Sequence, residues 1–302
     1  MRTLLIYSTT LEDDYKPYYE ILAKEFARGG GEMLFAMPPD MLIAPSTFSG
    51  ALRIADGWTR VEGPIAVDAI FNKSLSPFKP EDGWIINHPV LDAACDKDDT
   101  AALFAAFCPR STIVGSADAL HPALETLRTD TIVMKPTSSY GGDGVWIGPR
   151  SDMPTPATFP VVIQEFIDTS GGIPGVCESR HDLRLITLGG RLVDCYVRRP
   201  AKDGYLSNVA QGGSIKQVPL DAVPEAAKQL ATKIDAAFSN FPDRSYSADM
   251  GLDSDGTWKL IELNSPPGLP QHEEETGTQL KILADFLWNA EKPSDTTLLP
   301  HG

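Results

Sequence analysis

Two strand-like runs late in the chain carry carboxylates at a spacing that suits a metal ion. The dipeptide Asp255-Gly256 separates these runs and predicts the turn of a β-hairpin. With a two-residue loop, Asp249 lies directly opposite Glu262; with a four-residue loop it lies diagonal to Glu262 on the same face. Strand alternation puts Asn264 on that face too. Such oxygen donors suit Mg²⁺, which would remove the repulsion between the two acids. The alternative is a solvated outer face that tolerates acidic pairs.

A lysine followed by a glycine-rich loop suits a phosphate group. Lys135 ends a strand-like run, and Gly141, Gly142 and Gly144 follow within the next ten residues. Glycines let backbone N–H groups approach phosphate oxygens, and lysine adds a point charge. The segment is not a Walker loop, because the lysine precedes the glycines. A hairpin turn that contains glycines is the alternative explanation.

The carboxylate hairpin continues into a proline- and glycine-rich loop that makes a family resemblance specific. The segment from Glu262 through Asn264 to Gly268 resembles the E-x-N-x-x-P-G segment of ATP-grasp ligases, especially glutathione synthetases and ribosomal-protein glutamate ligases. In that family the Glu and Asn, with the Asp of the preceding strand, hold Mg²⁺ on ATP. The resemblance therefore implies Asp249, Glu262 and Asn264 as metal ligands. It also makes Ser265 and Gly268 candidate substrate contacts.

Further segments agree with the family in their order along the chain. Asp96-Lys97 resembles the acidic residue and lysine that begin the ATP-binding region, and 162–167 resembles the hinge that holds adenine. The lysine and glycines at 135–144 resemble the lid that closes over ATP. The resemblance implies these nucleotide-binding residues: Lys97, Lys135, Gly141, Gly142, Gln164, Glu165, Phe166, Ile167, Asp182 and Asn208.

Three arginines resemble the residues that stabilise the transferred phosphoryl group in this family. Arg184 lies in a D-x-R pattern, and Arg198-Arg199 match an R-(R)…N…GG pattern in which one arginine faces the site. The sequence leaves open which of the two arginines faces the site. Lys73 ends an earlier strand-like run and resembles a basic substrate contact of the relatives. The stretch Thr169–His181 looks longer than in the ribosomal-protein ligases.

The elements that must position these residues follow from apolar spacing and turn signals. In the first third, residues 4–7, 32–37, 66–71 and 84–87 predict strands and 15–26 predicts a helix. Further strands are expected at 131–135, 145–147, 161–166, 183–187, 191–197, 246–252 and 258–263. Helices are expected at 96–107, 224–238 and 277–288.

The order of these elements, with adjacent hairpins, favours an α+β fold over a repeated βαβ array. The resemblance implies an ATP-grasp fold, between α+β and α/β in class, with a small N-terminal α/β domain. We predict a domain at 1–95 on the substrate side and an ATP-grasp domain at 96–302. Within the second, a lid subdomain covers about 96–163 and a C-terminal subdomain about 164–302.

Composition narrows the class of partner. The chain has 302 residues, a net charge of −15 and a pI near 4.7, which argues against nucleic acid and anionic membranes. Four scattered cysteines lack metal spacing and favour a reduced, cytoplasmic protein. No run approaches the roughly 20 apolar residues of a membrane span. The sequence leaves open whether the protein forms a homo-oligomer.

The resemblance implies a carboxylate–amine ligase that uses ATP and Mg²⁺, with Mn²⁺ as a possible substitute. Its substrates would be small-molecule or peptide carboxylates and amines, joined through an acyl phosphate with release of ADP and phosphate. One alternative is a small-molecule kinase on the same fold, which phosphorylates a hydroxyl and stops there. The other is a nucleotide-binding regulatory protein without turnover.

Overall fold

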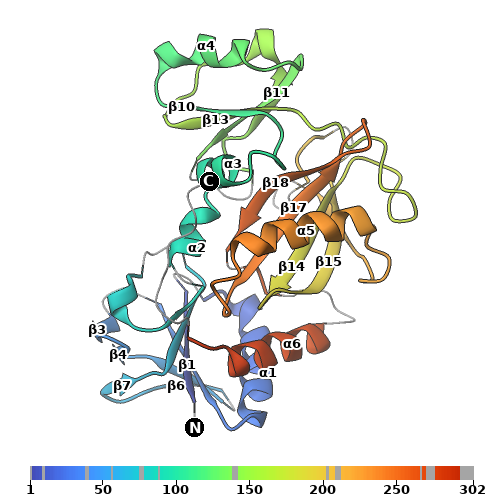
Figure 1. Ribbon diagram of the computed structural model, residues 1–302. Coiled ribbons are helices and arrows are strands. Elements are labelled where there is room, and N and C mark those ends of the chain that lie inside the picture. Colours follow the sequence, from blue (N-terminus) through green and yellow to red (C-terminus); the bar gives the residue numbers. More distant parts are fainter. Residues whose placement is uncertain are drawn as a thin grey trace.

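The structure is a computed structural model that describes most of the chain in three units stacked along its length (Figure 1). It describes residues 2–8, 11–37, 41–55, 57–74, 78–87, 89–137, 142–201, 204–207, 212–265, 267–269 and 276–292. Within these ranges, no helix is both long and apolar enough to cross a membrane. The α-helices are α1 (Lys16–Arg28), α2 (Pro89–Ala94), α3 (Lys97–Leu103), α4 (Leu120–Glu125), α5 (Glu225–Ala237) and α6 (Thr276–Asn289).

The lower unit is built on a six-stranded sheet with the order β6-β5-β2-β1-β8-β9. Its centre is parallel and buried on both faces, which explains why β1 is a continuous apolar run. A small three-stranded sheet, β3-β4-β7, was not predicted. The strands are β1 (Thr3–Tyr7), β2 (Glu32–Ala36), β3 (Leu42–Ala44), β4 (Thr47–Ser49), β5 (Leu52–Ile54), β6 (Trp58–Arg60), β7 (Pro64–Ala66), β8 (Ala69–Asn72) and β9 (Ile85–Ile86).

Helices α1 and α6 lie side by side in this unit, although they come from opposite parts of the chain (Figure 1). Leu22 and Phe26 of α1 share an apolar core with Leu280 and Leu287 of α6. The ring of Phe26 meets the ring of Trp288 edge-on, with 5.5 Å between the ring centres. The predicted domain boundary between residues 95 and 96 stays a prediction. The contacts show that α6, which lies in the predicted domain 96–302, packs against the lower unit.

The upper unit is a four-stranded antiparallel sheet with the order β10-β13-β11-β12. Helix α4 packs against its first strand. The sequence predicts β11, β12 and β13 to within two residues, but it did not predict β10 or α4. The strands are β10 (Ser111–Val114), β11 (Thr131–Pro136), β12 (Trp146–Pro149) and β13 (Val161–Glu165).

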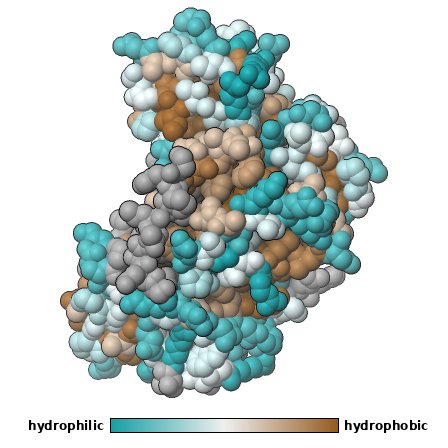
Figure 2. Space-filling model, in the orientation of Figure 1, coloured by the Kyte–Doolittle hydropathy of each residue, from teal (hydrophilic) through white to brown (hydrophobic). Residues whose placement is uncertain are grey.

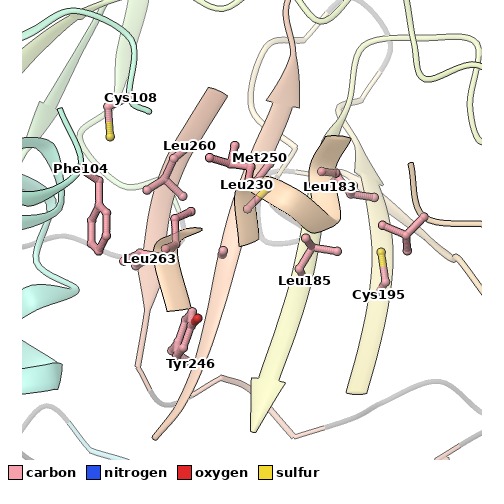
Figure 3. Packing of buried hydrophobic residues seen from close by; sticks show 14 of the residues in the cluster. Phe104, Cys108, Leu183, Leu185, Cys195, Leu230, Tyr246, Met250, Leu260 and Leu263 are labelled. Atoms are coloured by element: carbon pink, nitrogen blue, oxygen red, sulfur yellow. The ribbon is translucent and has the colours of Figure 1, made fainter. Parts of the chain in front are cut away.

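The middle unit is a five-stranded antiparallel sheet with the order β16-β15-β14-β17-β18. Helix α5 covers one face, where Leu230 packs with Leu183, Leu185, Met250 and Leu260 (Figure 3). Strand alternation turns the residues between them toward the opposite face of the sheet, which can therefore carry polar groups. The strands are β14 (Asp182–Leu188), β15 (Arg191–Arg199), β16 (Ser214–Gln217), β17 (Ser245–Leu252) and β18 (Trp258–Asn264).

The predicted helix at 96–107 is shorter than expected. Asp96 occupies the N-cap position but its side chain makes no capping bond, and α3 ends at Leu103. Phe104 then packs on Phe238 with 5.6 Å between ring centres. The carbonyl oxygen of Phe107 accepts the N–H of Leu260 at 2.9 Å. A contact with the edge of the middle sheet therefore replaces the last turn of the predicted helix.

Candidate active site

The hairpin of β17 and β18 brings Asp249 directly opposite Glu262, as predicted. It does so with neither of the loops considered. The N–H of Asp253 donates to the oxygen of Thr257 at 2.9 Å, so the loop is longer than two residues. A β-bulge beside Asp249 then shifts the register and restores the opposed pair. Asn264 follows on the same face as Glu262.

Asp249 is fully buried and is held by two arginines. The Nε and Nη2 atoms of Arg184 donate to its Oδ1 and Oδ2 at 2.6 and 2.5 Å. Arg198 Nη2 donates to the same Oδ2 at 2.6 Å. Burial favours a neutral carboxyl, but the two guanidinium charges outweigh it and hold the pKa of Asp249 well below its ordinary value. Asp249 is therefore ionised at neutral pH.

Arg198 also pairs with Asp182, one of the predicted nucleotide-binding residues. Burial raises the pKa of Asp182 to about 7, although the Arg198 guanidinium opposes the shift. Its Oδ1 atom is buried and has no hydrogen-bond partner among the described residues. Asp182 therefore has an acceptor to offer to a ligand hydroxyl.

Glu262 and Asn264 complete the oxygen-rich face beside Asp249. The Nδ2 atom of Asn264 lies 3.4 Å from Asp249 Oδ2 and 3.4 Å from Glu262 Oε1. Burial and the negative charge of Asp249 raise the pKa of Glu262. A positive ligand at this face would therefore favour the ionised form of Glu262.

Two lysines from other elements meet this face. Lys135 of β11 donates from Nζ to the carbonyl oxygen of Ile261 at 3.2 Å, and Lys97 begins α3. Burial lowers the pKa of both lysines, and the nearby Glu262 carboxylate opposes that change. The two ammonium groups are thus held close to Glu262 in a poorly solvated place.

One cavity collects most of the predicted residues. It lies where the upper unit meets the middle one, a junction at which apolar surface gathers (Figure 2). Gly141 and Asn208 lie outside the described residues. The predicted residues that line the cavity are Lys97, Lys135, Gly142, Gln164, Phe166, Ile167, Asp182, Arg198, Glu262 and Asn264.

Two predicted residues face elsewhere because their strands alternate. Glu165 follows the cavity residue Gln164, and its Oε1 accepts the backbone N–H of Arg128 at 2.7 Å. Arg199 follows Arg198 and lines a neighbouring hollow. Of the two adjacent arginines, Arg198 is the one that faces the cavity.

The candidate substrate residues lie at the junction with the lower unit. Lys73, directly after β8, donates from Nζ to the carbonyl oxygen of Pro267. Ser265 Oγ accepts from Asn87 Nδ2 at 2.8 Å. Gly268 lines a second cavity, beside α6. These residues lie together, but outside the cavity that collects the nucleotide-binding candidates.

A cluster around Arg180 is not among the predicted site residues. The centre of its guanidinium group lies 5.4 Å from the ring centre of Phe166 and 4.6 Å from that of Tyr205. Its Nη1 atom is buried and has no hydrogen-bond partner in the described part of the chain. All three residues line the main cavity, with His181. The unusual length of residues 169–181 was the available signal.

Solved structures with the same fold are similar over nearly the whole chain. D-cycloserine synthetase DcsG has a TM-score of 0.64 and 15% identity, over 94% of this chain and 99% of that one. The ATP-grasp ligase PsnB, complexed with a phosphomimetic variant of its minimal precursor, Mg and ADP, has a TM-score of 0.54 and 12% identity, over 94% and 99%. These similarities confirm the predicted ATP-grasp fold.

Sequence relatives cover a smaller part. The probable alpha-L-glutamate ligase 2 of Pseudoalteromonas atlantica is 30% identical over 141 residues, which are 45% of this chain and 40% of that protein. The chain therefore spans less than half the length of this relative. The family model described as the RimK-like ATP-grasp domain matches residues 105–285, more than half of the chain. The chain belongs to the RimK-like ATP-grasp family.

Proposed function

We propose that the protein is an ATP- and Mg²⁺-dependent ligase that joins a carboxylate to an amine. The observation that carries this proposal is the buried cluster of Arg184, Asp249 and Arg198 beside Glu262. Preorganised cations next to carboxylates stabilise the charge that develops during phosphoryl transfer. The family's relatives and neighbours are named as ligases, which supports the same reading.

In this proposal the main cavity holds ATP. The base lies at the hinge formed by Gln164, Phe166 and Ile167, and the ribose lies near the free acceptor of Asp182. The phosphates point toward Lys97, Lys135 and the loop at Gly142. Glu165 would then contribute through its backbone alone, because its side chain bonds Arg128.

The oxygen donors suit Mg²⁺, and Mn²⁺ could take the same ligands. Asp249, Glu262 and Asn264 offer two carboxylates and an amide on one face, the donor set of a hard cation. Both oxygens of Asp249 bond arginines, so the ion would share this carboxylate with them or displace one. When bound, the ion neutralises charge on the phosphate oxygens.

The residues of the chain then perform two tasks. Arg184 and Arg198 stabilise negative charge as the γ-phosphoryl group passes to a carboxylate oxygen, which yields an acyl phosphate and ADP. An amine attacks the acyl carbon, a C–N bond forms, and phosphate leaves with that oxygen. The lid at Gly142 excludes water, which would hydrolyse the intermediate.

Several finer assignments belong to the same proposal. The substrates are small-molecule or peptide carboxylates and amines, the protein acts in the cytoplasm, and the chain divides at residues 95 and 96. Asn208 keeps a supporting role near the phosphates, whereas Arg199, which lines the neighbouring hollow, takes none. A kinase on this fold would release ADP without an amine, and a regulatory protein would bind ATP without turnover.

Labelled oxygen tests the mechanism. A carboxylate substrate that carries ¹⁸O, found by screening acid and amine pairs for ADP release, should pass one labelled oxygen to the released phosphate. ADP release that does not require an amine would favour the kinase. Release of AMP, or label retained wholly in the acid and the amide, would overturn the proposal.

A further inference from the structure

A second cavity lies on the same face of the middle sheet as Asp249, nearer to the lower unit. It lies between β14 and β15 on one side and α6, β8 and the loop after β18 on the other. Helix α6 therefore forms one wall of this cavity and also packs on α1. Most of its wall is aliphatic or aromatic: Phe71, Ile186, Leu188, Leu269, Ile282 and Leu283.

The second cavity adjoins the proposed reaction centre through Tyr196. This residue lines the cavity and is the register partner of Arg184, whose guanidinium hydrogen bonds with the phenol oxygen. On β17, Ser245 of the cavity lies on the same face as Asp249, four residues away. A molecule in this cavity would therefore reach the arginines from the side opposite the nucleotide candidates.

The charges around the cavity select an anion at its edge and a neutral group inside it. Among its described lining residues none is Lys, Arg or His, and the one carboxylate, Asp194, already accepts from Gln217 and the N–H of Cys195. At the edge, Lys73 Nζ lies 5.5 Å from the ring centre of Phe71 and has no carboxylate partner in the described ranges. A carboxylate fits beside Lys73, whereas a second carboxylate inside the cavity would be buried without a cation.

We propose that this cavity binds the uncharged, largely aliphatic side chain of the acid substrate, whose reacting carboxylate lies between Lys73 and Arg184. The inference rests on the proposed function and adds the substrate class. The cation at the edge favours the acid as occupant, because the acid must bring a carboxylate to the reaction centre. Ser245 Oγ and Gln279 Oε1 are buried without partners among the described residues, and they leave room for one neutral polar group.

Gly268 provides a way to fill the cavity without a clash. A Cβ atom added at this position meets no atom of the described residues within 4 Å, and its backbone is not in the left-handed region. Gly268→Val would therefore place methyl groups in the space that a substrate side chain needs. Gly277 on α6 is equally open but lies outside the cavity, so Gly277→Ala is the matched control.

The test compares alanine, leucine and glutamate as acids, each supplied free and N-acetylated, with hydroxylamine as the amine. We expect kcat/KM for leucine to exceed that for glutamate by about 100-fold, since a neutral pocket rejects an unpaired charge. Gly268→Val should lower kcat/KM for leucine at least about 10-fold more than for alanine. Gly277→Ala should change neither value.

A reversed variant tests the charge argument directly. Gln279→Lys puts a cation into the cavity and should raise kcat/KM for glutamate relative to leucine by about 10-fold or more. Calorimetric binding of the same acids, with a non-hydrolysable ATP analogue present, gives the ranking without turnover. Equal or better use of glutamate by the unaltered protein would overturn this inference and leave the ligase proposal intact. Absence of ADP release with every acid would overturn both.

Discussion

Arg184 and Asp249 are register partners on neighbouring strands, and two parallel hydrogen bonds join the guanidinium group to the carboxylate. The pair belongs to a row that crosses four strands. Tyr196 lies opposite Arg184 on one side, and Glu262 lies opposite Asp249 on the other. A ligand that draws Arg184 away from Asp249 would therefore change the charge felt by Glu262, so the proposed metal, phosphate and acid sites would be electrostatically linked.

Replacement of Arg184 by lysine should slow chemistry more than it weakens ATP binding. Lysine keeps one charge but loses the two-point geometry. We expect kcat to fall about 100- to 1,000-fold while the Kd for ATP changes less than about 3-fold. Arg191→Lys, at an exposed arginine that begins β15, is the control. An equal loss in kcat and in ATP affinity would argue against a role in the transition state.

Glu262→Ala should abolish turnover while the protein stays folded. The change removes an oxygen donor and also relieves repulsion with Asp249, so Tm without metal should hold or rise. ADP release across a Mg²⁺ titration, together with thermal unfolding, measures both effects. Glu225→Ala on α5 provides a carboxylate control. Wild-type turnover at saturating Mg²⁺ would show that Glu262 is not a ligand.

Arg180→Ala should weaken ATP binding without a matching loss of kcat. Its guanidinium group is held by Phe166 and Tyr205, its Nη1 atom has no hydrogen-bond partner among the described residues, and Arg180 lines the main cavity. We expect the Kd for ATP to rise about 10-fold, the value of one hydrogen bond to a charged group. Arg128→Ala, at an exposed arginine, should leave Kd unchanged. An unaltered Kd in Arg180→Ala would limit the cluster to packing.

Acid binding should weaken as pH rises through the titration of Lys73. Burial lowers the pKa of Lys73 to about 8, so the ammonium form that attracts a carboxylate is lost above that pH. We expect kcat/KM for the acid to be level below pH 8 and to fall above it. Lys73→Arg stays charged and should remove this fall. The KM for ATP should not depend on pH in either protein. The same pH profile in Lys73→Arg would assign the fall to another group.

Asp243 should make stability depend on pH. Burial raises its pKa to about 6, against a hydrogen bond from Trp84 Nε1 at 2.9 Å that favours the ionised form. Between pH 4 and 6 the unfolded chain releases a proton that the folded protein largely keeps, so the free energy of unfolding falls by about 2 kcal/mol as pH rises. Asp243→Asn should remove that fall. Denaturant unfolding of both proteins at pH 4 and 6 measures this change. An equal change in the free energy of unfolding in the two proteins would contradict the assignment.

Sequence spacing predicts the long elements and the pairing of Asp249 with Glu262 well, because both depend on local periodicity. Helices α5 and α6 differ from their predictions by one residue at each end. The three-residue strands β3 to β7 were missed, since such short segments carry no period. Strand alternation could have separated Gln164 from Glu165 and Arg198 from Arg199.

The cluster around Arg180 could not be read from spacing in the same way. Its guanidinium group is placed by Tyr205, which reaches Phe166 from a loop after β15. Such a contact depends on tertiary packing between segments that are far apart in the chain. Only the extra length of residues 169–181 was visible beforehand, and length alone does not tell which side chain turns inward.

The packing of α6 on α1 has a consequence for how the protein is made. The lower unit can form its sheet early in translation, but Leu22 and Phe26 stay uncovered until residues 276–289 leave the ribosome. The same helix supplies Ile282 and Leu283 to the second cavity. A nascent chain therefore carries an exposed apolar stripe, a natural site for chaperones, and gains the proposed acid-binding pocket only when α6 docks.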